Sequence, residues 1–356
     1  MKLFFLGLDG ASAQIMFERD LPNTRKLLSE STYRPCMAEE DYPYTGPSWT
    51  SIYTGVSTQE HGVTDLWGRN VEGSESYDTL RDPVLWEMLN QAGMTTGVVH
   101  MPLTTCNRRV DGYIISGFPN ELDHAGVAAE LMPLMQGRDL SDLIRLTPRD
   151  RILDNTWYRN YDLAQSIDIM KSMVRWKAEA TRLLVRTHPI DCLFVQYSML
   201  DRIGHLLNQY LRVHDGQGWS YEPLLELYDW LDGQLADLLD VGADYDLLVI
   251  TSDHGWPAQA TEPYTHDGKL FGAWHSHDGV LVIRGDAHSG AVPADRRLEP
   301  CYNRDVCPAV LGLLGEDYAA LRHATRPVPA EQARTTGAGE SAESTIEERL
   351  RALGYL

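Results

Sequence analysis

The sequence predicts an α/β fold: a mainly parallel central sheet flanked by helices, with a small, mostly helical cap insertion. Two observations lead to this prediction. Short, nearly continuous apolar runs alternate with segments of helical periodicity, and Asp or His residues follow the ends of several runs. Uninterrupted apolar runs are typical of strands that helices bury on both faces. Strands that alternate with helices indicate an α/β domain.

Six apolar runs are the expected strands: 2–8, 95–101, 112–117, 192–199, 245–252 and 279–285. Four segments with helical spacing are the expected helices: 83–92, 163–187, 221–239 and 304–314. The first run, "KLFFLGL", resembles a weak signal peptide, but it is short and Asp9-Gly10 interrupts it where cleavage would have to occur. We therefore expect it to be a buried strand. No run approaches the roughly 18 apolar residues that a membrane span requires.

Parts of the chain do not follow this alternation. Residues 120–162 have an irregular helical pattern, and we predict that they form a cap inserted into a catalytic core of residues 1–119 and 163–325. Residues 326–345 are rich in Pro, Gly, Ser and Ala, which is typical of a flexible linker. The remaining residues, 346–356, are expected to form a short C-terminal helix.

The charge of the chain limits its partners. Its 356 residues include 31 Lys and Arg against 51 Asp and Glu, which gives a formal net charge of −20. This sign argues against duplex nucleic acid or an anionic membrane as the main partner. A small phosphate-bearing substrate stays compatible with it, because a bound metal can reverse the local sign in a pocket. The cysteines are scattered, without a CxxC pair, and indicate reduced thiols in a cytoplasmic setting: Cys36, Cys106, Cys192, Cys301 and Cys307.

The stretch "YTGPSWTSIYTG", residues 44–55, allows two interpretations. In the first, Thr45 caps a helix whose first turn contains Pro47. In the second, the Thr45 hydroxyl lies at a helix N-terminus, where backbone N–H groups and the helix dipole favour a bound phosphate. This stretch alone favours the cap, since caps far outnumber nucleophiles.

Acidic and imidazole side chains gather where the predicted strands begin or end. They are Asp9, Asp201, His205, Asp253, His254, His275 and His277. Each alone has an ordinary explanation, as a turn residue, a helix cap or part of a solvated face. Ligands in α/β sheets, however, bind beyond the carboxyl ends of strands, so these residues converge on one rim. Three Asp and three His beside a hydroxyl suit two zinc-like ions. Two ions about 4 Å apart can hold the attacking and leaving oxygens of an in-line displacement.

The motifs "LDG", "TGPSWTSIYTG", "DRIGH", "SDHG" and "AWHSHDG" follow one another in an order that resembles the alkaline phosphatase superfamily. The type I phosphodiesterase/nucleotide pyrophosphatase family is the most similar branch, and the resemblance covers roughly residues 2–318. It implies a two-metal hydrolase that cleaves a phosphodiester or nucleotide pyrophosphate bond. Its substrate would be a small phosphate ester, with nucleotides among the candidates.

The resemblance also implies a set of metal ligands. One ion would lie among Asp9, Thr45, Asp253 and His254, and the other among Asp201, His205 and His275. His275 is preferred to His277 because the family places this ligand four positions before a Gly, here Gly279. Zn²⁺ is the first expectation for both ions, with Mn²⁺ or Fe as alternatives.

The resemblance makes Thr45 the nucleophile, which forms a phosphoryl–threonine intermediate. The backbone N–H of Gly46 would contact a phosphoryl oxygen, since no side chain blocks close approach. Ser48 stands where the resemblance leads us to expect an Asn that donates to the same oxygen, and Ser has a shorter reach. The same residues argue against a sulfatase, because Thr45 and Trp49 stand where the C/S-x-P-x-R signature of the sulfatases has its oxidisable Cys or Ser and its Arg. No Arg lies beside Thr45 to hold a second phosphate charge, which favours a diester over a monoester.

Further residues are candidates for substrate binding: His277, His266, Lys269 and Trp67. A solvated loop or ordinary core packing explains them equally well. His61 is expected to make a structural turn contact. Two alternative functions stay open: a phosphomonoesterase or phosphonate-type hydrolase on the same metal site, and a non-catalytic metal-binding scaffold. The oligomeric state is not indicated by the sequence.

Overall fold

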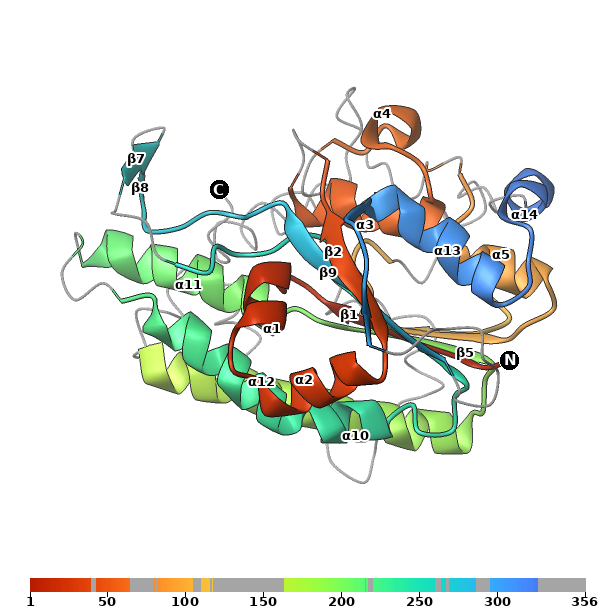
Figure 1. Cartoon of the computed structure of the whole chain (residues 1–356), viewed down its shortest axis with the longest axis horizontal. Coiled ribbons are helices and arrows are strands. Elements are labelled where there is room, and N and C mark those ends of the chain that lie inside the picture. The colour runs from red at the N-terminus through yellow and green to blue at the C-terminus, as the bar shows by residue number, and fades with distance from the viewer. Residues whose placement is uncertain are drawn as a thin grey trace, which may run out of the picture.

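The computed structural model describes residues 1–39, 43–64, 80, 82–104, 110–115, 117, 163–214, 216, 220–259, 264–266, 269–285 and 295–325. The predicted cap at 120–162, linker at 326–345 and helix at 346–356 lie outside these residues. In the described part of the chain, a twisted sheet runs through the centre and helices cover both of its faces (Figure 1). No helix there is long and apolar enough to cross a bilayer.

The central sheet is mixed and mostly parallel, as predicted. Its strand order is β10-β2-β9-β6-β1-β5-β3-β4, and β11 also pairs with β2. All pairings within it are parallel except those of β9, which runs antiparallel to β6 and to β2. In chain order the strands are β1 (Leu3–Leu8), β2 (Thr32–Met37), β3 (Thr96–Val99), β4 (Gly112–Ile115), β5 (Cys192–Tyr197), β6 (Leu247–Thr251), β9 (Asp278–Gly285), β10 (Arg296–Arg297) and β11 (Cys301–Tyr302). A separate hairpin joins β7 (Tyr264–His266) to β8 (Lys269–Phe271).

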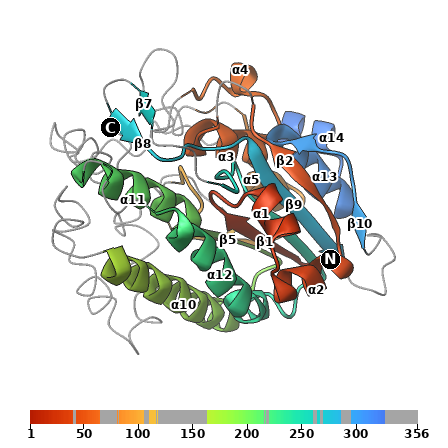
Figure 2. The ribbon, with the colours of Figure 1, turned by 60° about the vertical axis from the view of Figure 1, so that its left-hand side comes forward.

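Two hydrophobic cores form because the side chains of each strand alternate between the faces of the sheet. In β1, Phe4 and Leu6 enter one core while Leu3 and Phe5 enter the other. The first core is covered by α1 (Ala13–Glu18), α2 (Pro22–Ser29), α10 (Leu163–Thr187), α11 (Met199–Val213) and α12 (Glu222–Asp240). Figure 2 shows α10, α11 and α12 side by side along this face. The second core is covered by α3 (Thr45–Thr54), α5 (Leu85–Gln91) and α13 (Val306–Leu313).

Three short helices complete the described chain. They are α4 (Thr58–His61), the 3-10 helix η1 (Asn303–Asp305) and α14 (Tyr318–Ala324). All six predicted strands are present, and α10 has the predicted bounds, while α5, α12 and α13 agree within a few residues. The sequence analysis missed β2, whose segment "TYRPCM" contains polar residues and Pro35 instead of an apolar run.

The strand directions bring the predicted site residues to one edge of the sheet. The parallel strands β1, β5 and β6 all end there, and the Asp9 N–H donates to the carbonyl of Tyr197 at the end of β5 (3.0 Å). Because β9 is antiparallel, its first residues lie at the same edge, and the Ser252 N–H donates to the Val280 carbonyl (3.0 Å). Segments that follow β1, β5 and β6 therefore meet the segment that precedes β9.

His61 links α4 to the middle of α3. Its Nδ1 accepts a hydrogen bond from the Val63 N–H (3.0 Å), so the proton is on Nε2, which lies 3.0 Å from the Ser51 hydroxyl oxygen. This is the structural contact expected from the sequence. Burial lowers the pKa of His61 from 6.5 to about 4, because the charged imidazolium would lose its hydration.

We predict that His61 makes the protein sensitive to acid. The unfolded chain takes up the His61 proton below pH 6.5 and the folded chain only near pH 4. The stability contributed by the neutral side chain is therefore present above pH 6.5 and is lost as the pH falls to 4, by about 3 kcal/mol. The measurement is the free energy of unfolding in urea from pH 7 to 4 for the wild type and His61→Gln.

The gap between these two stability curves should close by roughly this amount as the pH falls. His188→Gln, at an exposed position, is the matched control and should leave the wild-type curve unchanged in shape. Parallel curves for the wild type and His61→Gln would contradict the prediction.

Candidate metal centre

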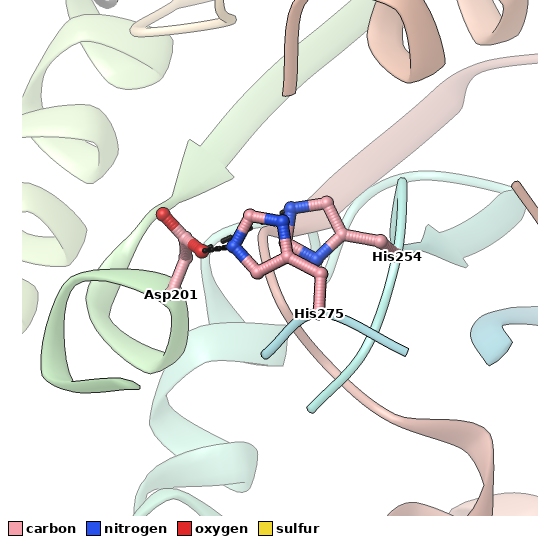
Figure 3. Close-up of side chains that lie close together, drawn as sticks. All are labelled: Asp201, His254 and His275. Carbon is pink, nitrogen blue, oxygen red and sulfur yellow. Dashed lines mark ion pairs between the residues drawn. The ribbon is translucent and has the colours of Figure 1, made fainter. Parts of the chain in front are cut away.

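Two groups of buried Asp and His side chains meet at this edge of the sheet. Asp201, His254 and His275 form the first group and Asp9, Asp253 and His254 the second, and within each group the potential ligand atoms lie within 4.8 Å of one another. Figure 3 shows the first group, with the Asp201 carboxylate facing the His275 ring. Since His254 belongs to both groups, the two are adjacent.

His205 extends the first group. It lies on α11, one helical turn after Asp201, and its Nε2 is 3.4 Å from the Asp201 Oδ1. The Nε2 atoms of His205 and His275 are 3.0 Å apart, and the His275 Nε2 is 3.1 Å from the same carboxylate oxygen. Two imidazole nitrogens and one carboxylate oxygen thus converge on one point.

Hydrogen bonds on the far side of the rings orient two of these imidazoles. The Nδ1 of His275 lies 2.7 Å from the Pro43 carbonyl oxygen, and the Nδ1 of His254 lies 3.3 Å from that of Gly255. A carbonyl only accepts, so each Nδ1 carries a proton, and Nε2 is the ring nitrogen that a metal ion would bind. Metal-binding His residues commonly have this arrangement.

In the carboxylates of Asp9 and Asp253, one oxygen accepts hydrogen bonds and the other has no hydrogen-bond partner in the described chain. The Asp9 Oδ2 accepts from the Trp49 indole N–H (3.2 Å) and the Gln196 amide (2.9 Å). The Asp253 Oδ1 accepts from the Gly10 N–H (3.4 Å). The other oxygen of each, Oδ1 of Asp9 and Oδ2 of Asp253, has no hydrogen-bond partner within the described chain.

The bare atoms fit divalent metal ions. Besides these two carboxylate oxygens, the His254 Nε2 and the Thr45 Oγ1 are buried without a hydrogen-bond partner among the described residues. Leaving such an atom unsatisfied costs about 1–3 kcal/mol each. Carboxylate, imidazole and hydroxyl groups are metal ligands, and one cation would satisfy several of them together. The two Asp/His groups therefore match a site for two metal ions.

The pKa shifts of the three aspartates also indicate that bound positive charge would stabilise the site. Burial raises the pKa of Asp9 well above its usual range, and the charges of Asp253 and Asp201 raise it further. The pKa of Asp253 is raised by burial and by Asp201. Burial would raise the pKa of Asp201 too, but His205 and His275 outweigh it and hold this pKa well below the usual range. Without cations the buried carboxylates repel one another, and bound cations would reverse this effect.

The pKa values of two imidazoles in the same site, His205 and His254, are lowered. Burial lowers the pKa of His254 well below its usual value, and the neighbouring His275 lowers it further. Burial also lowers the pKa of His205, although Asp201 opposes this shift. Neutral imidazoles are the form that binds metal, so the rings are ready as ligands at neutral pH.

Thr45 is the first residue of α3, and the first interpretation of this stretch, in which Thr45 caps the helix, is wrong. The N-cap position belongs to Tyr44, and the Thr45 hydroxyl is buried, at 3% exposed for the residue, without a capping bond. Contacts on either side of Thr45 tie it to the metal centre. Pro43 accepts from His275 and Trp49 donates to Asp9, so the segment from Pro43 into α3 contacts both groups.

Close backbone packing holds the loops of the centre together. Gly10 follows Asp9 with φ of +77°, and a Cβ there would lie 2.9 Å from the Asp201 backbone nitrogen. Only glycine fits this conformation and this gap without strain. On the other side of the same loop, the Tyr228 hydroxyl accepts from the Ser12 N–H (2.9 Å) and donates to the Gly10 carbonyl (3.2 Å).

Aromatic rings and one amide position the imidazoles from behind. Trp274 stacks on His275 (5.0 Å between centroids, 17°), and Trp256 meets His205 edge to face (5.3 Å, 84°). The Asn208 side chain bonds to the Ala273 carbonyl (2.8 Å) and to the Gly272 N–H (3.0 Å), which fixes the segment before His275.

Several of these positioning residues were not among the predicted site residues: Trp49, Gln196, Asn208 and Tyr228. Gln196 offered a signal, since it is the one polar side chain in the apolar strand "CLFVQY". Asn208 lies one turn beyond His205 on α11 and could have been found by helical spacing. Nothing local marks the others.

The remaining predicted residues lie elsewhere. Ser48 is buried in the first turn of α3, and its N–H donates to the Tyr44 carbonyl (3.0 Å). Gly46 is the second residue of α3. His277 is half-buried and belongs to neither group. Trp67 and the side chains of His266 and Lys269 are outside the described part of the structure.

Comparisons with known proteins agree with this geometry. The sequence matches the family Type I phosphodiesterase / nucleotide pyrophosphatase over residues 3–294. Among solved structures, murine ectonucleotide pyrophosphatase/phosphodiesterase 5 is similar at a TM-score of 0.54 and 12% identity, with 89% of this chain and 96% of that chain covered. The human counterpart gives a TM-score of 0.51 and 12% identity, with 89% and 95% covered. An inactive threonine-to-alanine variant of the murine protein, in complex with AMP, gives a TM-score of 0.50 and 12% identity, with 89% and 96% covered. These likenesses confirm the fold. A comparison with curated protein sequences finds no match.

We predict that Asp201→Asn lowers the metal content by about one ion per chain, because the first group loses its carboxylate. Elemental analysis of the purified protein after metal loading measures this. Asp229→Asn is the matched control, since Asp229 forms an exposed ion pair with Arg19, and it should retain the wild-type content. An unchanged metal content in Asp201→Asn would remove Asp201 from the ligands.

Proposed function

Because the chain belongs to the type I phosphodiesterase/nucleotide pyrophosphatase family, we propose that it is a two-metal hydrolase of phosphodiester or nucleotide pyrophosphate bonds, with Thr45 as its nucleophile. One observation carries this proposal. Two buried Asp/His groups share His254, and Pro43 and Trp49, on either side of the buried Thr45, hydrogen-bond to one group each.

The chemistry of the ligands supports two zinc ions, with Mn²⁺ or Fe as alternatives. Asp9, Asp253, His254 and the Thr45 hydroxyl would hold one ion, and Asp201, His205 and His275 the other. Mixed imidazole and carboxylate ligands at four-coordinate sites are typical of zinc. When bound, the two ions would neutralise the carboxylates and polarise the phosphoryl oxygens.

The residues of the chain would act on the substrate in a defined order. The Thr45 Oγ1 attacks phosphorus and passes its proton to water. The bond between phosphorus and the leaving-group oxygen breaks, and this oxygen departs with the electron pair. Water then hydrolyses the phosphoryl–threonine and regenerates the hydroxyl. During attack, the Gly46 N–H at the start of α3 donates to a phosphoryl oxygen, because the first N–H groups of a helix have no intrahelical partner. Ser48, one turn later, is the candidate second donor.

The substrate class follows from what surrounds Thr45. Residues 44–55 contain no Lys or Arg, so nothing in this stretch offsets the second negative charge of a phosphomonoester. A diester or pyrophosphate, with one charge on the attacked phosphorus, fits this setting better. The complex of the murine variant with AMP adds support for a nucleotide as one part of the substrate.

We predict that the metal-loaded protein hydrolyses a p-nitrophenyl phosphodiester at least about tenfold faster than the corresponding phosphomonoester or sulfate. The measurement is the steady-state release of p-nitrophenol, with chelator-stripped protein as the control, which should be inactive. A preference for the monoester would contradict the diester proposal and favour a phosphatase. No hydrolysis with two metals bound would favour the non-catalytic scaffold.

We further predict that Thr45→Ala reduces turnover by about 10³-fold or more, because the nucleophile is lost. The Asp and His ligands remain, so the metal content should stay near that of the wild type. Thr45→Ser, which keeps a hydroxyl, should retain part of the activity. Thr54→Ala, on the same helix and buried nine residues away, controls for disturbance of α3 and should stay active. Full activity of Thr45→Ala would show that another group attacks phosphorus.

A further inference from the structure

Two buried cysteines face each other on neighbouring strands beneath the metal centre. Cys36 of β2 and Cys301 of β11 are register partners in a parallel pairing. Neighbouring strands lie about 4.8 Å apart, and disulfides span Cα separations of about 4.4–6.8 Å. Both side chains enter the same hydrophobic core, so they project from the same face of the sheet. The backbone therefore already meets the distance requirement for a disulfide.

The two thiols are not equivalent. The neighbouring Cys36 thiol lowers the pKa of the Cys301 thiol, although burial opposes this shift. The neighbouring Cys301 and burial both raise the pKa of Cys36. Cys301 is also the more accessible residue, at 7% exposed against 0% for Cys36. Cys301 is therefore the thiol that ionises and meets a small oxidant first.

A short chain of hydrogen bonds connects this pair to a predicted metal ligand. The Cys36 thiol donates to the Asn303 Oδ1 (3.2 Å), and the Asn303 amide donates to the Asp253 carbonyl (2.7 Å). Asn303 is fully buried, so its side chain has few other ways to satisfy its polar atoms. A change at the Cys36 sulfur thus reaches the backbone of Asp253 through one side chain.

We propose that Cys36 and Cys301 are a modification site, at which a peroxide forms a reversible disulfide and loosens the support that Asn303 gives to Asp253. The disulfide is independent of the proposed function, whereas its effect on Asp253 rests on the metal site described above.

The chemistry has two balanced steps. The Cys301 thiolate attacks one oxygen of hydrogen peroxide, the O–O bond breaks, and the products are a Cys301 sulfenic acid and hydroxide. The Cys36 sulfur then attacks the Cys301 sulfur, the S–O bond breaks, and the disulfide forms with the release of one water. Cys36 loses its proton in this step, so its hydrogen bond to Asn303 is lost. The sulfurs are oxidised by two electrons, and the peroxide is reduced by two.

The first experiment maps the disulfide in the full-length protein. Native protein is treated with hydrogen peroxide, free thiols are blocked with N-ethylmaleimide, and an unreduced digest is analysed by mass spectrometry. We expect one linked peptide pair, Cys36–Cys301, and a loss of two of the five thiols, both reversed by dithiothreitol. Cys192→Ala, which removes a buried cysteine outside the pair, is the matched control and should give the same linkage. Two free thiols at these positions, or another pairing, would overturn the proposal.

The second experiment measures the link to the metal centre without using activity. Metal release to a chromogenic chelator is followed for reduced, oxidised and re-reduced wild-type protein. We expect the oxidised form to release one ion about tenfold more readily and dithiothreitol to restore the original behaviour. Cys301→Ser, which cannot form the disulfide, should not respond to peroxide. An unchanged release in the oxidised wild type, or the same response in Cys301→Ser, would show that the disulfide does not act on the metal centre.

Discussion

The mutual repulsion of three buried carboxylates is the constraint on which the architecture of the centre depends. Asp9, Asp201 and Asp253 lie together away from water, where each negative charge loses its hydration at a cost of several kcal/mol. The protein offsets only part of this cost. Indole, amide and backbone N–H donors hold one oxygen each of Asp9 and Asp253, and imidazoles face Asp201. The negative charge that remains would be offset by bound cations, which is why the two Asp/His groups match a metal site.

The fold meets this constraint by strand direction. Parallel strands end at a common edge, so β1, β5 and β6 deliver Asp9, Asp201 and Asp253 to neighbouring positions from distant parts of the sequence. His275 could not come from a further parallel strand in the same way, because it precedes its strand. Because β9 is antiparallel to β6, it begins at the edge of the sheet where β1, β5 and β6 end. The antiparallel strand β9 therefore brings the segment before it, with His275, to the group that contains Asp201 and His254.

The sequence predicts most of the sheet because buried strands must be apolar on both faces, and runs such as "KLFFLGL" cannot be accommodated otherwise. The strand β2 was not predicted, because its segment contains Pro35 and partly exposed polar residues instead of an apolar run. Its pairing with β9 depends on backbone hydrogen bonds, which the sequence pattern does not reveal. The Asp and His residues of the centre are recognisable because each follows or precedes a strand. Asn303 and Trp49 are not, because their roles come from contacts with residues 50 and 40 positions away, and such contacts leave no local pattern.

The position of Thr45 shows why this residue is not the cap of its helix. At an N-cap, the threonine oxygen would accept an N–H from its own helix and be occupied. One position later, in α3, the hydroxyl makes no capping bond and is buried without a hydrogen-bond partner in the described part of the chain. Leaving such an oxygen unsatisfied costs about 1–3 kcal/mol. The residues on either side, Pro43 and Trp49, hydrogen-bond to the two Asp/His groups, whose unpartnered carboxylate oxygens carry the same cost. Because Tyr44 takes the cap position, the Thr45 hydroxyl is not used by its own helix.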